Sequence, residues 1–241
     1  MKMIFRYMRL VLFVITLLMA CTTPQKGIEV KVSGALKNMM HKGDVSAKIG
    51  LDTLGKYKHL YALGALENLK GEALILDSKS WSTSVEDKEL KFHDSLNDNA
   101  ALLVYANVNE WIEVELPKVE MGKDDLENEI YKLASKHGIE LDLPFPFLIK
   151  GVVKSLNWHV IDWKDGDMEH SHEKHVNSGL RDEFNNREVE ILGFYSQKHQ
   201  TIFTHHTTFM HLHFKTSDNK LAGHADDVVT GDKMKLYLPK N

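Results

Sequence analysis

The chain of 241 residues, 43% of them hydrophobic, is long enough to bury one sizeable core or two closely joined lobes. Its 34 acidic residues outnumber its 30 basic ones and give a net charge of −4. This argues against nucleic-acid binding, because such proteins present a basic field. Cys21 is the only cysteine, so the sequence excludes an internal disulfide, and any metal site in the folded part must use His, Asp and Glu ligands.

The first 20 residues predict a secretory signal rather than part of the fold. A basic segment precedes an apolar stretch at Leu10–Leu18, which is too short for a typical transmembrane helix. The ending Leu18-Met19-Ala20-Cys21 resembles a bacterial lipobox. We therefore expect cleavage before Cys21, lipidation of its thiol and anchoring in the cell envelope, on the periplasmic or outer-surface side, with residues 21–32 as a tether. A plain cleaved signal or an uncleaved anchor is the alternative.

Short alternating or apolar runs bounded by turn residues predict strands along most of the chain. In the first half the predicted strands are Leu60–Leu63, Glu72–Leu76, Ala101–Ala106 and Glu110–Leu116. In the second half they are Phe147–Lys150, Val152–Ile161, Glu188–Tyr195, Thr201–Thr204, Thr208–Phe214, Leu221–Val229 and Met234–Leu238.

Two helices are predicted among these strands. The clearer one spans Asp125–His137, with Asp124 as its cap and Gly138 at its end, and a shorter one lies near Ser33–His41. The sequence therefore predicts an α+β fold with two mixed or antiparallel β-sheet lobes and a few helices. We place the lobes at about residues 33–145 and 146–241.

Three histidines near the C-terminus have the spacing of a metal site. His211 and His213 are two residues apart on a predicted strand, so their side chains point to the same face. The turn residues Asp218-Asn219-Lys220 would return the chain and bring His224 alongside. Three imidazoles with a fourth position left open are typical of a catalytic zinc. The alternative is a polar strand face that carries histidines by chance, since the chain has 14 of them.

These residues and several other segments resemble the zinc-dependent α-acetolactate decarboxylases, over roughly Gly43 to Leu238. The segments that carry the resemblance are His211-Leu-His-Phe214, Gly223-His-Ala-Asp226, the Gly64–Asp77 stretch with Gly71-Glu72, His41-Lys-Gly-Asp44 and Gly193-Phe-Tyr-Ser196. The resemblance implies that His211, His213 and His224 bind Zn²⁺ and that Glu72 is an active-site carboxylate.

The resemblance also implies an activity, the decarboxylation of 2-acetolactate to acetoin. Zinc would act as a Lewis acid on the substrate oxygens, and Glu72 would move or hold a proton. From the residues alone, Glu72 at the start of an apolar strand is either a solvated strand end or a buried group with an altered pKa. The expected partners are a small-molecule substrate, the membrane through the lipid anchor and a second copy of the chain in a homodimer.

Two departures from the family concern the substrate. Leu148 takes the place of an active-site arginine, and leucine cannot replace an arginine that holds a carboxylate. The family also has a glutamate beyond the Leu-Pro that ends its last strand, and only two residues follow Leu238-Pro239 here. Lys150, Lys154 and His159 are the candidates for a positive charge that contacts the substrate.

Two other functions stay open at this point. A zinc-dependent ester hydrolase of the same superfamily would use Glu72 or Asp226 as the base for an activated water. A metal-binding surface lipoprotein without catalysis would use the histidines of His170-Ser-His-Glu-Lys-His175, because histidine-rich tracts bind metals. This histidine-rich tract lies in Asp165–Arg187, which is predicted to be a surface loop or lid.

Overall fold

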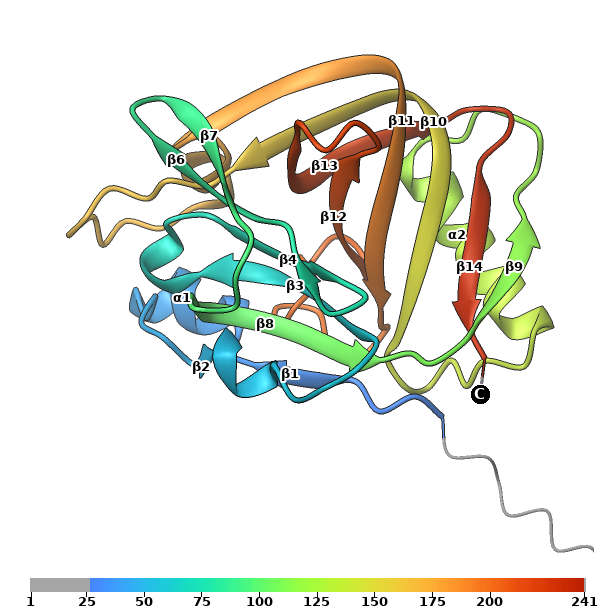
Figure 1. Ribbon diagram of the computed structural model, residues 1–241, viewed down its shortest axis with the longest axis horizontal. Coiled ribbons are helices and arrows are strands. Elements are labelled where there is room, and N and C mark those ends of the chain that lie inside the picture. Colours follow the sequence, from blue (N-terminus) through green and yellow to red (C-terminus); the bar gives the residue numbers. More distant parts are fainter. Residues whose placement is uncertain (1–26, 241) are drawn as a thin grey trace, which may run out of the picture.

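The computed structural model describes residues 27–240, which form two antiparallel sheets joined by short helices and loops (Figure 1). The predicted signal segment and the lipidation site Cys21 lie outside the described residues. No helix in this described part is long and apolar enough to cross a membrane. The fold class is α+β, as predicted, and every pairing between its strands is antiparallel.

The N-terminal sheet has the strand order β1-β8-β3-β4-β6-β7, with β2 and β5 at its margins. Its strands are β1 (Lys31–Ser33), β2 (Ile49–Gly50), β3 (Leu60–Leu66), β4 (Glu72–Leu76), β5 (Lys79–Ser80), β6 (Ser82–Glu86), β7 (Glu89–His93) and β8 (Asn99–Asn107). The helix α1 (Leu36–Lys42) and two short 3₁₀ turns, Leu51–Leu54 and Glu67–Leu69, connect them. The central strands are buried on both faces, which explains why they are nearly continuous apolar runs.

The C-terminal sheet has the strand order β11-β12-β13-β10-β14-β9, and an additional pairing of β11 with β10 closes its first four strands into a ring. Its strands are β9 (Trp111–Glu115), β10 (Phe145–Val160), β11 (Leu180–Tyr195), β12 (Met210–Thr216), β13 (Ala222–Thr230) and β14 (Lys235–Pro239). The helices are α2 (Lys123–Lys136) and the short α3 (His172–Val176). Buried residues of α2, among them Leu126 and Ile130, fill the core of this sheet.

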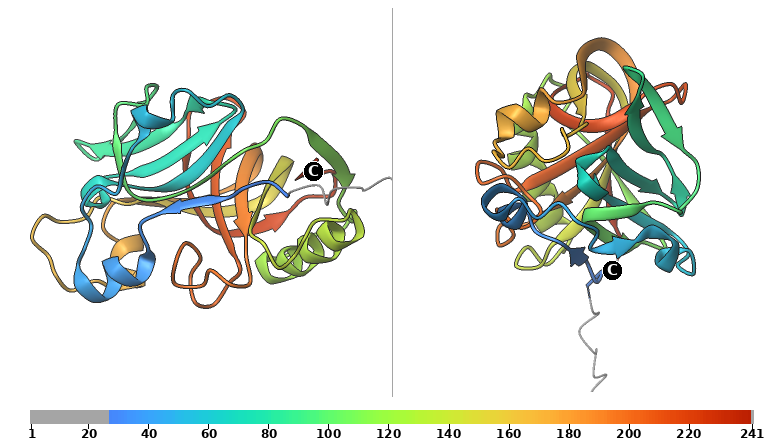
Figure 2. Two further views of the ribbon diagram at one scale, coloured as in Figure 1. Left: turned by 90° about the horizontal axis from the view of Figure 1, so that it is seen from below. Right: turned by 90° about the vertical axis from the view of Figure 1, so that its left-hand side faces the viewer.

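The two sheets share one apolar cluster, which fixes them against each other. Leu63 and Val104 contribute to it from the first sheet, and Leu148, Leu192 and Phe194 contribute from the second. On the same side of the molecule, α1, the α3 segment and the loop before β12 come together, as both views of Figure 2 show. These three segments surround the mouth of the cavity described below.

The structure corrects several predicted boundaries. The lobe boundary predicted at residue 145 is wrong, because β9 pairs with β14 and α2 packs in the core of the C-terminal sheet. The chain therefore crosses from the N-terminal to the C-terminal sheet at residues 108–110. The helix α2 begins at Lys123 with Gly122 at its N-cap, and Asp124 lies in its first turn instead of capping it. The predicted strand Thr201–Thr204 is a turn.

Two further segments differ from the prediction. The two strands predicted on either side of Gly151 are one continuous strand, β10, whose glycine has a φ of 140°. The predicted loop Asp165–Arg187 is a loop only in its first half, because β11 begins at Leu180.

Candidate metal centre and active site

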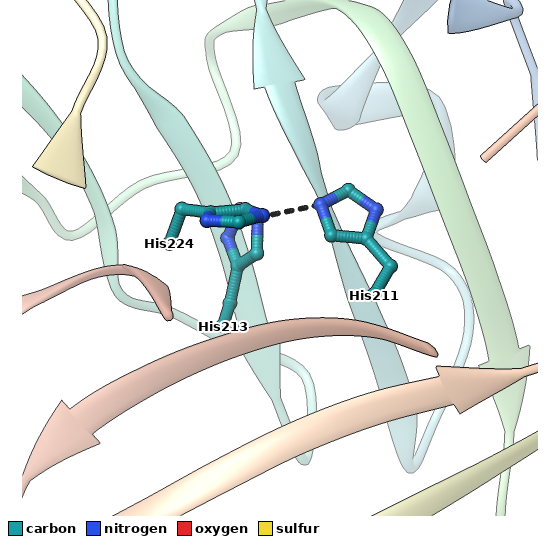
Figure 3. A group of neighbouring side chains, drawn as sticks. All are labelled: His211, His213 and His224. Carbon is teal, nitrogen blue, oxygen red and sulfur yellow. Dashed lines mark hydrogen bonds between the residues drawn. The ribbon is translucent and has the colours of Figure 1, made fainter. Parts of the chain in front are cut away.

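The structure brings the three predicted metal ligands together. The Nε2 atoms of His211 and His213 are 3.2 Å apart, and one nitrogen from each of His211, His213 and His224 lies within 4.8 Å of the other two (Figure 3). Their ring centroids are 4.9 to 5.3 Å apart. This convergence on one point is what a three-histidine metal site requires.

The hairpin of β12 and β13 produces this arrangement. His213 and His224 are directly opposite each other in the strand register, and His211 projects from the same face two residues earlier. The turn between the strands is fixed by Asp218, whose carboxylate accepts from the Thr216 hydroxyl at 2.6 Å and from the Lys220 main-chain N–H at 3.2 Å. Asn219 takes the left-handed conformation that such a turn needs, with φ of 59°.

The three imidazoles are neutral, which is the form of histidine that binds a metal, and His213 is buried whereas His211 and His224 are half-buried. Burial lowers the pKa of His211 and of His213 well below the usual histidine value, and the neighbouring imidazoles lower both further. Burial also lowers the pKa of His224 to about 4. The Nδ1 atoms of His211 and His213 are buried without a hydrogen-bond partner among the described residues. A neutral, convergent donor set of this kind fits a bound divalent metal ion.

Asp226 orients the third ligand. His224 Nδ1–H donates to Asp226 Oδ1 at 3.0 Å, which leaves its Nε2 free to face the other two histidines. His159 Nδ1–H donates to the two oxygens of the same carboxylate at 2.8 and 2.9 Å. Burial favours the protonated form of Asp226, but these hydrogen bonds hold the pKa of its carboxyl well below the usual range. Carboxylates commonly fix ligating histidines in this way.

Glu72 lies beside the metal centre and is only 4% exposed. One of its oxygens is 3.6 Å from His213 Nε2, and the other is 3.6 Å from His159 Nε2 and accepts from the Ile161 main-chain N–H at 3.2 Å. Burial raises the pKa of Glu72 to about 7, against the charge of His159, which lowers it. Glu72 is therefore the buried group with an altered pKa, and the solvated strand end is excluded.

One cavity of about 640 Å³ at the junction of the two sheets is lined by Glu72, Asp226 and three histidines, His159, His211 and His224. The size lies within the range of small-molecule sites. Its mouth carries a set of histidines from α1, the α3 segment and the loop before β12: His41, His170, His172, His175, His205 and His206. His170 Nδ1 and His175 Nε2 are 2.9 Å apart, but no three of these mouth histidines converge as His211, His213 and His224 do.

Of the three residues predicted to contact the substrate, the structure places only one in the cavity. His159 lines the cavity, whereas Lys150 and Lys154 do not and form ion pairs with Glu190 and Glu120 instead. The structure thus removes the two lysines from the site.

Leu148 does not occupy a cavity position either. It is 2% exposed and packs in the apolar cluster between the sheets. The expectation that Leu148 stands at a position that contacts the substrate is therefore wrong.

The sequence reasoning missed Lys123, which lines the cavity from the first turn of α2. Burial lowers the pKa of Lys123, against the opposing effect of Asp226 and other nearby carboxylates. Nothing in its local sequence distinguishes Lys123 from a solvated lysine at a helix start. The sequence predicts Asp226 only as a base, although its position two residues after His224 on a strand places both on one face.

With this geometry in place, comparison with known proteins identifies the family. The model of the alpha-acetolactate decarboxylase family matches residues 35–240. The chain belongs to this family. A comparison with curated proteins gives no match.

Solved structures agree with the family at the level of the fold. Alpha-acetolactate decarboxylase from Bacillus subtilis strain 168 has a TM-score of 0.70 and 17% identity, with 88% of this chain and 86% of that chain covered. A Staphylococcus aureus protein of unknown function, described as similar to alpha-acetolactate decarboxylase, has a TM-score of 0.65 and 14% identity over the same shares. At these identities the likeness shows the shared architecture.

Proposed function

We propose that this protein decarboxylates 2-acetolactate to acetoin with a zinc ion bound by His211, His213 and His224. The observation that carries the proposal is the convergence of these three neutral imidazoles beside a buried carboxylate, Glu72, in one cavity of an alpha-acetolactate decarboxylase family member. When bound there, zinc would supply Lewis-acid stabilisation for the negative charge that develops on the substrate oxygens as CO₂ leaves.

Glu72 is suited to handle the proton of this reaction. Loss of CO₂ leaves a pair of electrons on the carbon that carried the carboxylate, and acetoin forms when that carbon takes up a proton. Glu72 is buried beside the three histidines, so its carboxyl group is placed to hold this proton and release it. The Ile161 N–H and the His159 ring hold Glu72 in place, and Asp226 holds His159.

Replacement of Glu72 by glutamine tests this role. Glutamine keeps the size and an acceptor for the Ile161 N–H, so zinc content should stay unchanged, while acetoin release from racemic acetolactate should fall about 10²–10⁴-fold, the usual contribution of a general acid–base group. Glu89→Gln, an exposed residue at the edge of the N-terminal sheet, is the matched control. A Glu72→Gln protein that makes acetoin as fast as this control would contradict the proposal.

Ester hydrolysis is the second candidate, and one observation favours it. No arginine is among the cavity-lining residues in the described part of the chain, so the cavity lacks the usual bidentate partner of a carboxylate, and a neutral ester has no need of one. Zinc-loaded protein that hydrolyses simple esters but leaves acetolactate intact would establish this alternative. A zinc-loaded protein that turns over neither class would instead indicate a metal-binding protein without catalysis.

We also propose that the protein is exported and lipid-anchored through Cys21. The support is the order of a basic segment, an apolar segment and Leu18-Met19-Ala20-Cys21 in the sequence. Cys21→Ala should release the protein from the membrane fraction or leave its signal segment uncleaved. Recovery of the unaltered protein from the soluble cytosol with Met1 still present would contradict the proposal.

A further inference from the structure

Lys123 is a cation in the cavity wall that has no ion-pair partner in the described structure. Two lysines line the cavity, and Lys37 is exposed whereas Lys123 is half-buried. Lys123 Nζ donates to the main-chain carbonyl of Asp226 at 2.7 Å, and no carboxylate among residues 27–240 forms a salt bridge with it. An ammonium group has three donors, so two of them remain available to a ligand in the cavity.

The position of Lys123 ties it to the metal centre. It bonds the main chain of Asp226, whose carboxylate holds His224 Nδ1 at 3.0 Å. Lys123, His211 and His224 all line the same cavity. The first turn of α2 therefore places a positive charge in the chamber into which the metal ligands point.

The other cationic group of the inner cavity is already engaged. His159 donates through Nδ1 to Asp226 at 2.8 Å, and its Nε2 faces Glu72 at 3.6 Å. Both nitrogens are thus directed at carboxylates of the protein. Glu72 and Asp226 thus both face histidines, whereas Lys123 has no salt-bridge partner among the described residues and remains open to an anionic ligand.

We propose that Lys123 binds the carboxylate of the substrate, in a cavity that residues 27–240 line without an arginine. The inference rests on the proposed function and extends it, because it assigns the anion-binding group that the sequence does not reveal. It defines the ligand class as a small 2-hydroxy acid whose carboxylate contacts the ammonium while its hydroxyl and carbonyl oxygens face the three histidines.

This assignment predicts which kinetic constant changes. The carboxylate loses its charge as CO₂ departs, so an ammonium that holds it stabilises the bound substrate more than the transition state. Loss of Lys123 should therefore raise KM without lowering kcat. A hydrogen bond to a charged group corresponds to about ten- to hundredfold in binding.

The experiment compares an acid with its neutral ester on zinc-loaded protein. The probes are 2,3-dihydroxy-2-methylbutanoate, which cannot decarboxylate as acetolactate does, and its methyl ester, and binding is measured by isothermal titration calorimetry. The wild-type protein should prefer the acid, Lys123→Met should lose that preference about ten- to hundredfold, and Lys123→Arg should keep most of it. Lys37→Met, the exposed cavity lysine, is the matched control and should bind as the wild type does.

Zinc content and acetoin release are measured on the same samples. An unchanged preference for the acid in Lys123→Met, or no preference in the wild type, would overturn the inference. If the wild type prefers the acid through Lys123 but releases no acetoin, the carboxylate site stands and the proposed reaction fails. If acetoin release is normal and the preference is independent of Lys123, the reaction stands and the inference fails.

Discussion

Replacement of Asp226 by asparagine should weaken zinc binding, although Asp226 is not itself a proposed zinc ligand. Its carboxylate accepts from His224 Nδ1 at 3.0 Å and from His159 Nδ1 at 2.8 and 2.9 Å. An asparagine side chain has one acceptor oxygen, and its NH₂ group would face one of the two imidazole N–H groups. Loss of one charge-assisted hydrogen bond costs about 1.5–3 kcal/mol, and loss of such an orienting partner typically weakens metal binding about 10–100-fold.

The neighbouring residue provides the control. Asp227 is exposed on the same strand and accepts only from the Val228 main-chain N–H, so Asp227→Asn removes the same charge without touching a histidine. The zinc dissociation constants of both variants are measured by competition with a chromophoric chelator. The Asp226→Asn value should be the higher by about 10–100-fold. Equal zinc affinity in the two variants would refute the role of Asp226 in orienting His224.

Three further predictions concern the metal and the core. Metal analysis should show that His213→Ala loses its zinc on desalting, whereas the variant of an exposed histidine, His137→Ala, keeps it. Full zinc content in His213→Ala would contradict the assignment of His213 as a zinc ligand. Leu148→Arg should lower the free energy of unfolding by about 3–5 kcal/mol because it buries an unpaired charge. Val152 is 46% exposed on the same strand, so Val152→Arg should not lower it, and equal denaturation midpoints of the two variants would contradict this prediction. Chelation of zinc should lower the unfolding temperature, since a ligand that binds only the folded state stabilises it; an unchanged unfolding temperature would argue against a buried metal.

The three-histidine cluster could be predicted from the sequence because it is local. A spacing of two residues on a strand fixes a common face, and a turn of known chemistry fixes the return strand, so His211, His213 and His224 needed no knowledge of the rest of the fold. The same rule applies to Asp226, which follows His224 by two residues.

The surroundings of the metal centre depend on contacts between distant segments. His159 reaches it because β10 pairs with β13 and places His159 opposite His224. The register of β10 shifts between Val153 and Ser155 and again between Asn157 and Trp158. Counting alternate residues along β10 therefore fails, because a bulge moves later side chains to the other face.

The effect of these shifts is visible in the packing of β10. Phe147 and Ile149 face the same apolar cluster as Leu156 and Trp158. The side chains that face this cluster are therefore at odd-numbered positions early in β10 and at even-numbered positions later in the strand. Leu148 faces the shared cluster between the sheets. No local pattern in the sequence could have separated this buried leucine from the cavity or brought His159 into it.

Zinc titration of the metal-free protein is the most direct test of zinc-dependent decarboxylation. Acetoin release from racemic acetolactate is followed as zinc is added to the stripped chain. The proposed function predicts no acetoin release without zinc, and a rise that stops when one zinc is bound per three-histidine site. Acetoin release that is independent of zinc, or no release from a protein with this site filled, would contradict it.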